Sequence, residues 1–316
     1  MVVNPWSSRA RSADLAPFLD TLAQSGIAVE VAECARGQAP GQVLLEHATR
    51  THESLIVAGG DGTIRSAARA LISLGRPVGL APLGTANDLA RGLGIPNDLV
   101  EAARIIASGK TRLIDVALAN DELFFNGAGI GLGPALTNEM DAKEKAALGV
   151  LAYFKALLRA VGRRSSFRAD IDCDGRRLRL RVMQVTIANG RYYGGGMTVA
   201  REARLDDSML DVLAIKPFGL WSVLKLAPKL RWGLSMPVSE IATERGRCIK
   251  VKTRRRMQIT TDGELTTRTP VTFEVRPRTL RVFVADGDAI GADALDAGET
   301  GHDASSDVPA RAAVAR

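Results

Sequence analysis

The sequence predicts a chain in two parts: an α/β half, built on a parallel sheet with helices on both faces, and then an all-β half. Residues 1 to about 118 alternate apolar, strand-like runs with segments of helical periodicity, whereas strand-like patterns dominate from about residue 119. With 316 residues, 46% of them hydrophobic, the chain can also fill two cores. We therefore expect domains at 1–118 and 119–285, and a disordered tail at 286–316 that lacks periodicity.

In the first half, the elements follow one another as in a doubly wound sheet. The expected strands are Val2–Val3, Val29–Ala32, Leu55–Ala58 and Thr111–Ala117, and the expected helices are Ser12–Gln24, Gln42–Arg50, Ile64–Leu71 and Leu99–Ser108. In parallel sheets of this kind, ligands bind at the carboxyl ends of the strands.

In the second half, a hairpin is the clearest signal. Phe167–Cys173 alternates apolar and polar residues, turns at Asp174-Gly175 and returns as Leu178–Val182. Further strands are expected at Met183–Ala188, Met209–Ile215, Ile249–Val251, Met257–Ile259, Val271–Val275 and Leu280–Val284, with helices at Lys143–Gly162 and Leu220–Gly233. An antiparallel sandwich or barrel is the natural architecture for this pattern.

Two glycine-containing loops carry the chemistry of the first half. Ala58-Gly59-Gly60-Asp61-Gly62-Thr63 and Pro82-Leu83-Gly84-Thr85-Ala86-Asn87-Asp88 each follow a strand and open a helix, where backbone N–H groups can face a phosphate. The glycines can take positive φ and allow close approach, and Thr63 can cap its helix. Asp61 would repel a phosphate unless a divalent cation lay between them, so the loop indicates a magnesium nucleotide. The alternatives are a plain tight turn for the first loop and a capping box from Thr85 to Asp88 for the second.

Composition narrows the choice of partners. The formal charge of +7 and the pI of about 9.6 suit an anionic partner such as a membrane surface, a nucleotide or a nucleic acid. Nucleic acid is the weakest of these, because only 4% of residues are aromatic and no stacking motif is present. No apolar run approaches the roughly eighteen residues of a transmembrane helix, and no leader pattern opens the chain, so a cytoplasmic protein without a transmembrane segment is expected.

Seven short motifs, in order, resemble one family. They are Asn4-Pro5-x-Ser7, Gly59–Thr63, Pro82–Asp88, Phe125–Gly131, Asn189–Gly196, Leu205–Val212 and Thr261-Asp262-Gly263-Glu264. Together they resemble the bacterial lipid kinases of the diacylglycerol kinase catalytic-domain family, relatives of sphingosine kinases, NAD kinases and phosphofructokinases. The resemblance covers nearly everything from Met1 to about Val284, and it implies an NAD kinase/phosphofructokinase-like α/β domain followed by a β-sandwich that receives the lipid.

The resemblance also implies roles for particular residues. ATP would contact Asn4, Pro5, Trp6, Ser7, Ser8, Gly59, Gly60, Asp61, Gly62, Thr63, Ile64, Arg65, Gly84, Thr85 and Asn87. The catalytic Mg²⁺ would be held through Asp61, Asp88 and Asp115, and a structural Mg²⁺ by Asp207 with the carbonyls of Arg204 and Met209. Asp262 would be the general base with Glu264 as its close partner, although the family role could fall on either. Taken alone, Asp262-Gly263 indicates a hairpin turn, and Asp207 an ion pair with Arg201 or Arg204.

Four residues, at three places in the sequence, depart from the family pattern. Arg65-Ser66 stands where asparagine and glutamate are usual, Ser8 replaces a glycine of the first phosphate loop, and Ser208 replaces the glycine beside Asp207. Any polar contact made by the usual side chains is therefore lost or is replaced by Arg65.

The expected function is ATP-dependent phosphorylation of a lipid hydroxyl, of diacylglycerol, sphingoid or phosphatidylglycerol type, during transient peripheral contact with a membrane. The basic, apolar-interleaved helix expected at Leu220–Gly233 would suit such contact, or would simply pack on the sandwich. The alternatives are an NAD kinase, which shares Gly59–Thr63, and a lipid- or nucleotide-binding protein without catalysis. A homodimer is left open.

Overall fold

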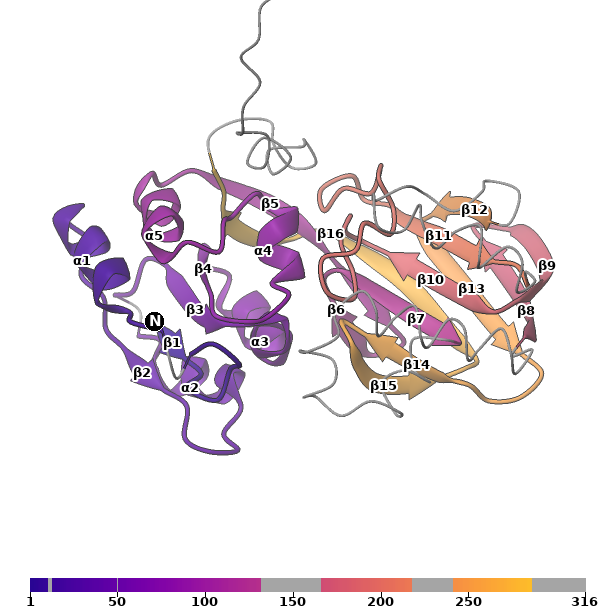
Figure 1. Ribbon diagram of the computed structural model, residues 1–316, viewed down its shortest axis with the longest axis horizontal. Coiled ribbons are helices and arrows are strands. Elements are labelled where there is room, and N and C mark those ends of the chain that lie inside the picture. Colours follow the sequence, from indigo (N-terminus) through magenta and orange to yellow (C-terminus); the bar gives the residue numbers. More distant parts are fainter. Residues whose placement is uncertain (11–12, 50, 132–165, 218–240, 286–316) are drawn as a thin grey trace, which may run out of the picture.

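The computed structural model describes residues 1–10, 13–49, 51–131, 166–217 and 241–285 (Figure 1). Within these ranges the predicted fold class is confirmed, because a mostly parallel α/β part is followed by two packed antiparallel sheets. The helices expected at 143–162 and 220–233 and the tail expected from residue 286 lie outside the described residues. Among the described residues, no helix is long and apolar enough to cross a membrane.

Four parallel strands form the centre of the first part. They lie side by side in the order β2 (Ala32–Glu33), β1 (Val2–Val3), β3 (Leu55–Gly59) and β4 (Val78–Pro82). Helices α1 (Ala16–Gln24) and α5 (Leu99–Ala107) pack together, as do α2 (Pro40–His47) and α3 (Asp61–Leu74), and Figure 1 shows the two pairs on opposite sides of the sheet. All residues of β3 and β4 are buried, which explains why these strands are continuous apolar runs.

Several predicted boundaries were wrong for identifiable reasons. The second strand is Ala32–Glu33 rather than Val29–Ala32, because Ala32 and Glu33 are the residues that pair in register with Val2 and Val3 of β1. Helix α1 begins at Ala16 rather than Ser12, since Asp14 accepts a hydrogen bond from the Ala16 N–H and a proline follows in the first turn. Helix α3 begins at Asp61 rather than Ile64, so Asp61 and Gly62 belong to the helix and Gly60 is its N-cap.

The second part is a sandwich, which decides between the two architectures that the sequence left open. One sheet runs β12 (Ile241–Gly246), β11 (Leu210–Ile215), β10 (Gln184–Ala188), β7 (Gly127–Gly131), β14 (Gln258–Thr261) and β15 (Glu264–Arg268). The facing sheet contains β16 (Val271–Phe283), β13 (Cys248–Thr253), β8 (Phe167–Cys173) and β9 (Arg176–Val182), with β5 (Thr111–Ala119) and β6 (Glu122–Phe124) beside β16. One apolar cluster, which includes Phe124, Ile130 and Phe273, fills the space between the sheets.

Strand β16 joins the two parts. The sequence predicted two strands here, Val271–Val275 and Leu280–Val284, but they form one strand with an irregularity between Arg276 and Leu280. Its first half pairs with β13 in the sandwich, and Val282 pairs in parallel with Val78 of β4. The parallel sheet and one sheet of the sandwich are therefore continuous through β16 (Figure 1).

Two Asp-Gly turns have the same geometry. Asp174 and Gly175, with φ of 47° and 91°, turn the predicted β8–β9 hairpin, whose pairing is confirmed. Asp262 and Gly263, with φ of 46° and 84°, turn β14 into β15. Positive φ at both central residues is the requirement of a type I′ turn. Asp262 is thus a turn residue, which does not prevent its side chain from having a second role.

Candidate functional site

A cleft of about 740 Å³ crosses the carboxyl ends of the parallel strands. Its walls follow the sheet order: Arg36–Pro40 lie after β2, Asn4 with Trp6–Ser8 after β1, Gly60–Thr63 after β3, and Gly84 with Thr85 after β4. Ser66 of α3 and Glu264 of β15 complete the lining. Ligand pockets typically measure about 300–1,000 Å³, so the cleft can hold one nucleotide.

The glycines of the two loops are required by close packing. A Cβ on Gly60 would lie 2.8 Å from the Gly84 Cα, and a Cβ on Gly59 would lie 2.5 Å from the Thr63 side chain. Gly59, Gly60 and Gly62 do not use the positive φ that glycine allows, since none of them is among the glycines with positive φ. The two loops instead meet backbone against backbone, which leaves no room for a side chain between them.

Thr63 and Thr85 hold the loop after β1, Asn4–Ser8, against the two glycine loops instead of capping helices. Thr63 Oγ1 accepts a hydrogen bond from Asn4 Nδ2 at 3.0 Å and shares one with Ser7 Oγ at 3.1 Å. Ser8 Oγ and Thr85 Oγ1 lie 2.9 Å apart. Helix α3 has no side-chain cap, so the predicted capping role of Thr63 was wrong. The hydroxyl of Ser8 thus finds a partner in the place where the family pattern has glycine.

Asp61 and Asn87 shape the second loop. The Asp61 carboxylate accepts hydrogen bonds from the backbone N–H groups of Asp88 and Leu89, both at 3.0 Å, at the start of α4 (Asp88–Gly92). Asn87 adopts φ of 51°, and its Oδ1 accepts from the Gly84 N–H at 2.9 Å. The capping box from Thr85 to Asp88, the alternative interpretation of this loop, does not form, because Asn87 is the N-cap and the carboxylate that faces the helix comes from Asp61.

Asp88 connects the two halves of the molecule. Its carboxylate accepts hydrogen bonds from the N–H groups of Gly195 and Gly196, at 3.1 and 2.6 Å, in the glycine run of the second half. Burial raises the pKa of Asp88, and these two hydrogen bonds oppose the rise. The glycine run Gly194–Gly196 is therefore anchored to α4.

Asp262 holds the turn that precedes β7. Its carboxylate accepts hydrogen bonds from the backbone N–H groups of Phe125 and Asn126 at 2.8 Å and of Gly127 at 3.2 Å. Burial raises the pKa of Asp262 to about 6, against the lowering effect of these three donors, and the charge of Asp61 raises it further. Asp262 and Asp61, distant in sequence, therefore lie close enough to influence each other.

Glu264 reaches across to the α/β part. It lines the cleft, its carboxylate forms an ion pair with Arg65 of α3, and a Cβ on Gly62 would lie 3.0 Å from Glu264 Oε1. The guanidinium of Arg65 thus occupies the junction between the two parts. Arg65 departs from the family pattern, and the structure provides it with a partner that sequence reasoning did not identify.

The remaining expected metal ligands form a second acidic group. Asp115 is fully buried and accepts hydrogen bonds from the N–H groups of Ser208 and Arg278, at 2.6 and 2.7 Å. Asp207 accepts from the Met209 N–H at 3.0 Å and pairs with Arg245. Burial raises the pKa of Asp207, Arg245 opposes the rise, and the charge of Asp115 adds to it. Arg204 pairs with Asp206 rather than Asp207.

The structure therefore divides the expected site residues. Asp61 and Glu264 line the cleft, whereas Asp88 and Asp262 do not. Asp115 and Asp207 lie together elsewhere, since Asp115 accepts the hydrogen bond of Ser208, the residue next to Asp207. Over the described ranges, no three His, Cys, Asp or Glu side chains converge as a ready-made metal site. The Ile64 side chain is buried in the core, and Pro5, Gly59, Arg65 and Asn87 support the cleft without lining it. Sequence reasoning missed Arg36–Pro40 and Ser66, although their place after β2 and within the first turns of α3 could have indicated them.

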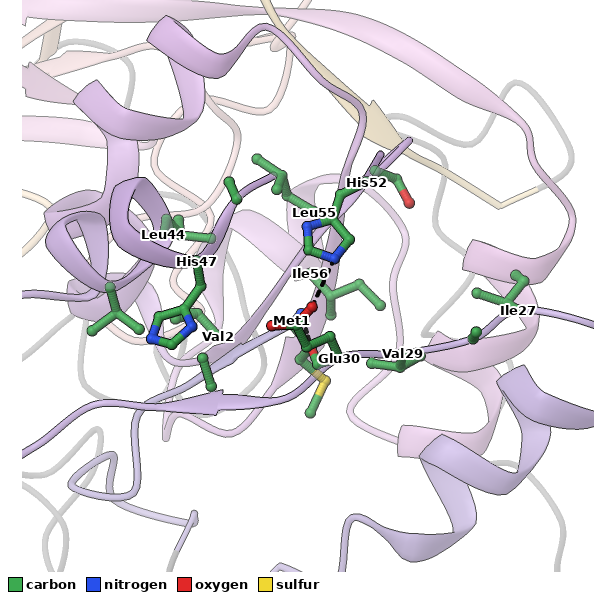
Figure 2. A pocket seen from close by; sticks show the side chains of 15 residues that line it. Met1, Val2, Ile27, Val29, Glu30, Leu44, His47, His52, Leu55 and Ile56 are labelled. Atoms are coloured by element: carbon green, nitrogen blue, oxygen red, sulfur yellow. Dashed lines mark hydrogen bonds and ion pairs between the residues drawn. The ribbon is translucent and has the colours of Figure 1, made fainter. Parts of the chain in front are cut away.

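A second hollow, of about 60 Å³, lies at the amino ends of β1 and β3 (Figure 2). His52 pairs there with Glu30 at 3.0 Å, and the Met1 ammonium group donates to the Glu30 carbonyl oxygen at 2.6 Å. This hollow is far smaller than typical ligand pockets and lies at the end of the strands opposite the cleft. The cleft is the candidate site.

Comparisons with known proteins agree with this geometry. A family model described as the diacylglycerol kinase catalytic domain matches residues 1–119, and one described as the YegS C-terminal NAD kinase beta sandwich-like domain matches residues 127–284. "Diacylglycerol kinase" of Bacillus subtilis is 32% identical over 69% of this chain and 73% of its own length. "Probable lipid kinase YegS-like" of Klebsiella pneumoniae is 38% identical over 50% of this chain and 54% of its own length.

A solved structure extends the likeness to the whole fold. The crystal structure of a putative diacylglycerol kinase from Bacillus anthracis superposes with a TM-score of 0.75 at 27% identity, and covers 90% of this chain and 94% of the other. The two family models together span both halves, and the cleft lies where the first half presents its glycine loops to Glu264 of the second. The chain belongs to the diacylglycerol kinase catalytic-domain family of lipid kinases.

Proposed function

We propose that this protein transfers the γ-phosphoryl group of ATP to the hydroxyl of a lipid, with ATP bound in the cleft. The observation that carries this proposal is the position of Glu264, which brings a carboxylate from the sandwich to the glycine loops of the α/β part. Phosphoryl transfer needs charge neutralisation and positioning more than covalent chemistry. The site combines backbone donors, carboxylates and room for a nucleotide.

The phosphates would bind at the start of α3. The first N–H groups of a helix have no acceptor within the helix, and the helix dipole favours an anion there. Because Gly60 and Gly84 are in contact, a phosphate can approach both loops without meeting a side chain. Asn4, Ser7 and Thr63 support this end through their shared hydrogen bonds.

Magnesium fits beside Asp61. Each oxygen of the Asp61 carboxylate accepts one backbone N–H and retains a lone pair, and Asp61 borders the cleft. Mg²⁺ in kinase sites is usually held by one or two carboxylates together with substrate phosphates and water, so a site with few protein ligands is sufficient. When bound, the ion would neutralise charge on the phosphates. At Asp207 the surroundings are different, because one carboxylate oxygen is already paired with the Arg245 cation, which a metal ion would have to displace. We therefore assign no step to a second ion.

The two carboxylates at the β14–β15 hairpin, Asp262 and Glu264, would have different roles in the transfer. Both Asp262 oxygens accept backbone hydrogen bonds, so this residue fixes the turn before β7. Glu264 borders the cleft directly, which favours it as the group that accepts the proton of the lipid hydroxyl. The hydroxyl oxygen then forms its bond to the γ-phosphorus while the bond to the β–γ bridging oxygen breaks, and ADP leaves. Arg65 would orient Glu264 for this step.

A basic surface on the sandwich supports peripheral contact with a membrane. The outward-facing residues of β8, β9 and β13 include the cations Arg177, Arg179, Arg181, Lys250 and Lys252 and the carboxylates Asp170 and Asp172. Each cation near an anionic bilayer contributes about 1 kcal/mol. A Lys250→Glu/Lys252→Glu variant should therefore sediment less with phosphatidylglycerol vesicles than the wild type, while neither binds phosphatidylcholine vesicles. Equal sedimentation of both proteins with phosphatidylglycerol would argue against this surface.

The decisive experiment measures transfer from γ-labelled ATP with Mg²⁺ to a bacterial lipid extract and to purified diacylglycerol, sphingosine and phosphatidylglycerol. A labelled lipid that is lost in Glu264→Gln would support the proposal, and chromatography would identify the acceptor. Labelled NADP formed from NAD would support an NAD kinase instead. Binding of ATP without transfer to any lipid would favour a non-catalytic protein.

A further inference from the structure

Trp6 is an unusual side chain for the wall of a polar cleft. Its exposed fraction is 47%, and it is the one aromatic residue among the exposed large hydrophobic side chains in the described part of the chain. The Arg36 guanidinium carbon lies over its ring, 5.7 Å from the centroid. Large apolar surface left open at a cleft is often covered by a ligand.

The sheet order places this pair at one end of the cleft. The strands run β2, β1, β3, β4, and the lining residues follow each in turn. Gly60 after β3 and Gly84 after β4 form the phosphate end, beside Glu264. Arg36 after β2 and Trp6 after β1 form the opposite end. A nucleotide with its phosphates at the start of α3 would therefore direct its base toward Trp6 and Arg36.

The side chains at this end of the cleft are better suited to stacking on the face of a base than to forming hydrogen bonds with its edge. An indole and a guanidinium both stack on the flat face of a base. The nearby amide of Gln38 is already engaged, since its Oε1 accepts from the Ala35 N–H at 3.1 Å and its Nε2 donates to Glu46 at 3.2 Å. Gly37, Ala39 and Pro40 offer no side-chain donor or acceptor.

We propose that Trp6 and Arg36 form a stacking wall for the purine of the phosphoryl donor, a role that rests on the nucleotide site proposed above. Because stacking depends on the area of the ring system, the wall favours purines over pyrimidines and distinguishes adenine from guanine only weakly. The Trp6 backbone is also held in register with the phosphate end, since its backbone N–H donates to Asn4 Oδ1 at 3.1 Å and Asn4 Nδ2 donates to Thr63.

The test separates base binding from phosphate binding. Calorimetry measures the affinities of ATP, GTP, CTP and inorganic triphosphate, each with Mg²⁺, for the wild type, Trp6→Ala, Trp6→Phe and Arg36→Met. Leu45→Ala is the matched control, because Leu45 is exposed at 57% but does not line the cleft. A Trp221→Phe/Trp232→Phe background leaves Trp6 as the single tryptophan, so quenching of its fluorescence reports base contact.

Stacking on an aromatic residue is worth about 1–3 kcal/mol per base, so Trp6→Ala should weaken ATP binding roughly 5- to 150-fold. The affinity for triphosphate should be nearly unchanged, Trp6→Phe should retain most of the ATP affinity, and GTP should bind within about tenfold of ATP. Equal losses for ATP and triphosphate, or no loss for either, would overturn the stacking wall while leaving the nucleotide site intact. If the wild type bound neither ATP nor triphosphate, the nucleotide site would be refuted, and the stacking wall with it.

Discussion

Replacing Asp262 with asparagine should remove a pH dependence of stability that the wild-type protein shows between about pH 4 and pH 7. Burial raises the pKa of this carboxyl from 3.8 to about 6 in the folded protein. A raised folded-state pKa means that the folded state binds the proton more tightly than the unfolded state. The resulting stabilisation is fully present below the unfolded pKa and is lost as pH rises through about 6.

The expected magnitude follows from the size of the shift. About two pKa units, at 1.36 kcal/mol each, correspond to roughly 3 kcal/mol in the free energy of unfolding. Urea unfolding, followed by circular dichroism at several pH values, would measure it. Relative to Asp262→Asn, the wild type should lose roughly that amount of stability between pH 4 and pH 7.

Asp174→Asn is the matched control for this measurement. Asp174 also turns a hairpin and accepts hydrogen bonds from the N–H groups of Arg247 and Cys248, but it is exposed. A change shared by both variants would belong to the lost backbone contacts rather than to burial. Parallel pH profiles for the wild type and Asp262→Asn would refute the argument that burial raises the Asp262 pKa.

Three further predictions address the cleft. Glu264→Gln should lower phosphoryl transfer by about 100-fold or more while ATP affinity changes little, and kinetics together with calorimetry would show whether it does. Arg65→Ala should lower kcat more than it raises the KM for ATP, with partial recovery in Arg65→Lys; an unchanged kcat would exclude a role for Arg65 in orienting Glu264. Gly60→Ala should lower the thermal midpoint and weaken ATP binding, because the new Cβ would lie 2.8 Å from the Gly84 Cα. Gly92→Ala, which meets only the end of a leucine side chain at 3.3 Å, is its control, and equal behaviour of the two would count against the close contact.

The parts of the fold that sequence predicted well are those that local chemistry determines. Buried parallel strands such as Leu55–Gly59 are continuous apolar runs, and the β8–β9 hairpin carries both its alternation and its Asp-Gly turn. Boundaries were less accurate, because they depend on pairing and capping. Ala32–Glu33 is a strand because β1 lies beside it. Helix α3 begins three residues before the predicted start at Ile64, because Gly60 serves as its N-cap without a side-chain hydrogen bond.

The candidate site was predictable in its residues but not in their partners. Motifs identified Asp61 and Asp88 but not the groups that they contact. Asp61 accepts a hydrogen bond from the Asp88 N–H at the start of α4, 27 positions away. Asp88 accepts one from the Gly195 N–H, 107 positions away. The ion pair between Arg65 and Glu264 joins residues 199 positions apart. Such pairs depend on how the two halves dock, which local patterns do not contain.

The path of β16 has a consequence for cutting the chain into pieces. A fragment that ends near residue 118 would keep β4 but lose the strand that pairs with it, together with Leu280, Val282 and Phe283 from the first core. It would present an apolar, unpaired edge, and such edges associate with other chains. A fragment beginning after residue 118 would in turn lack β5 along β16. Expression of either half should therefore give aggregated material, and a separable nucleotide-binding unit would need residues 271–284 joined back to it through a designed linker.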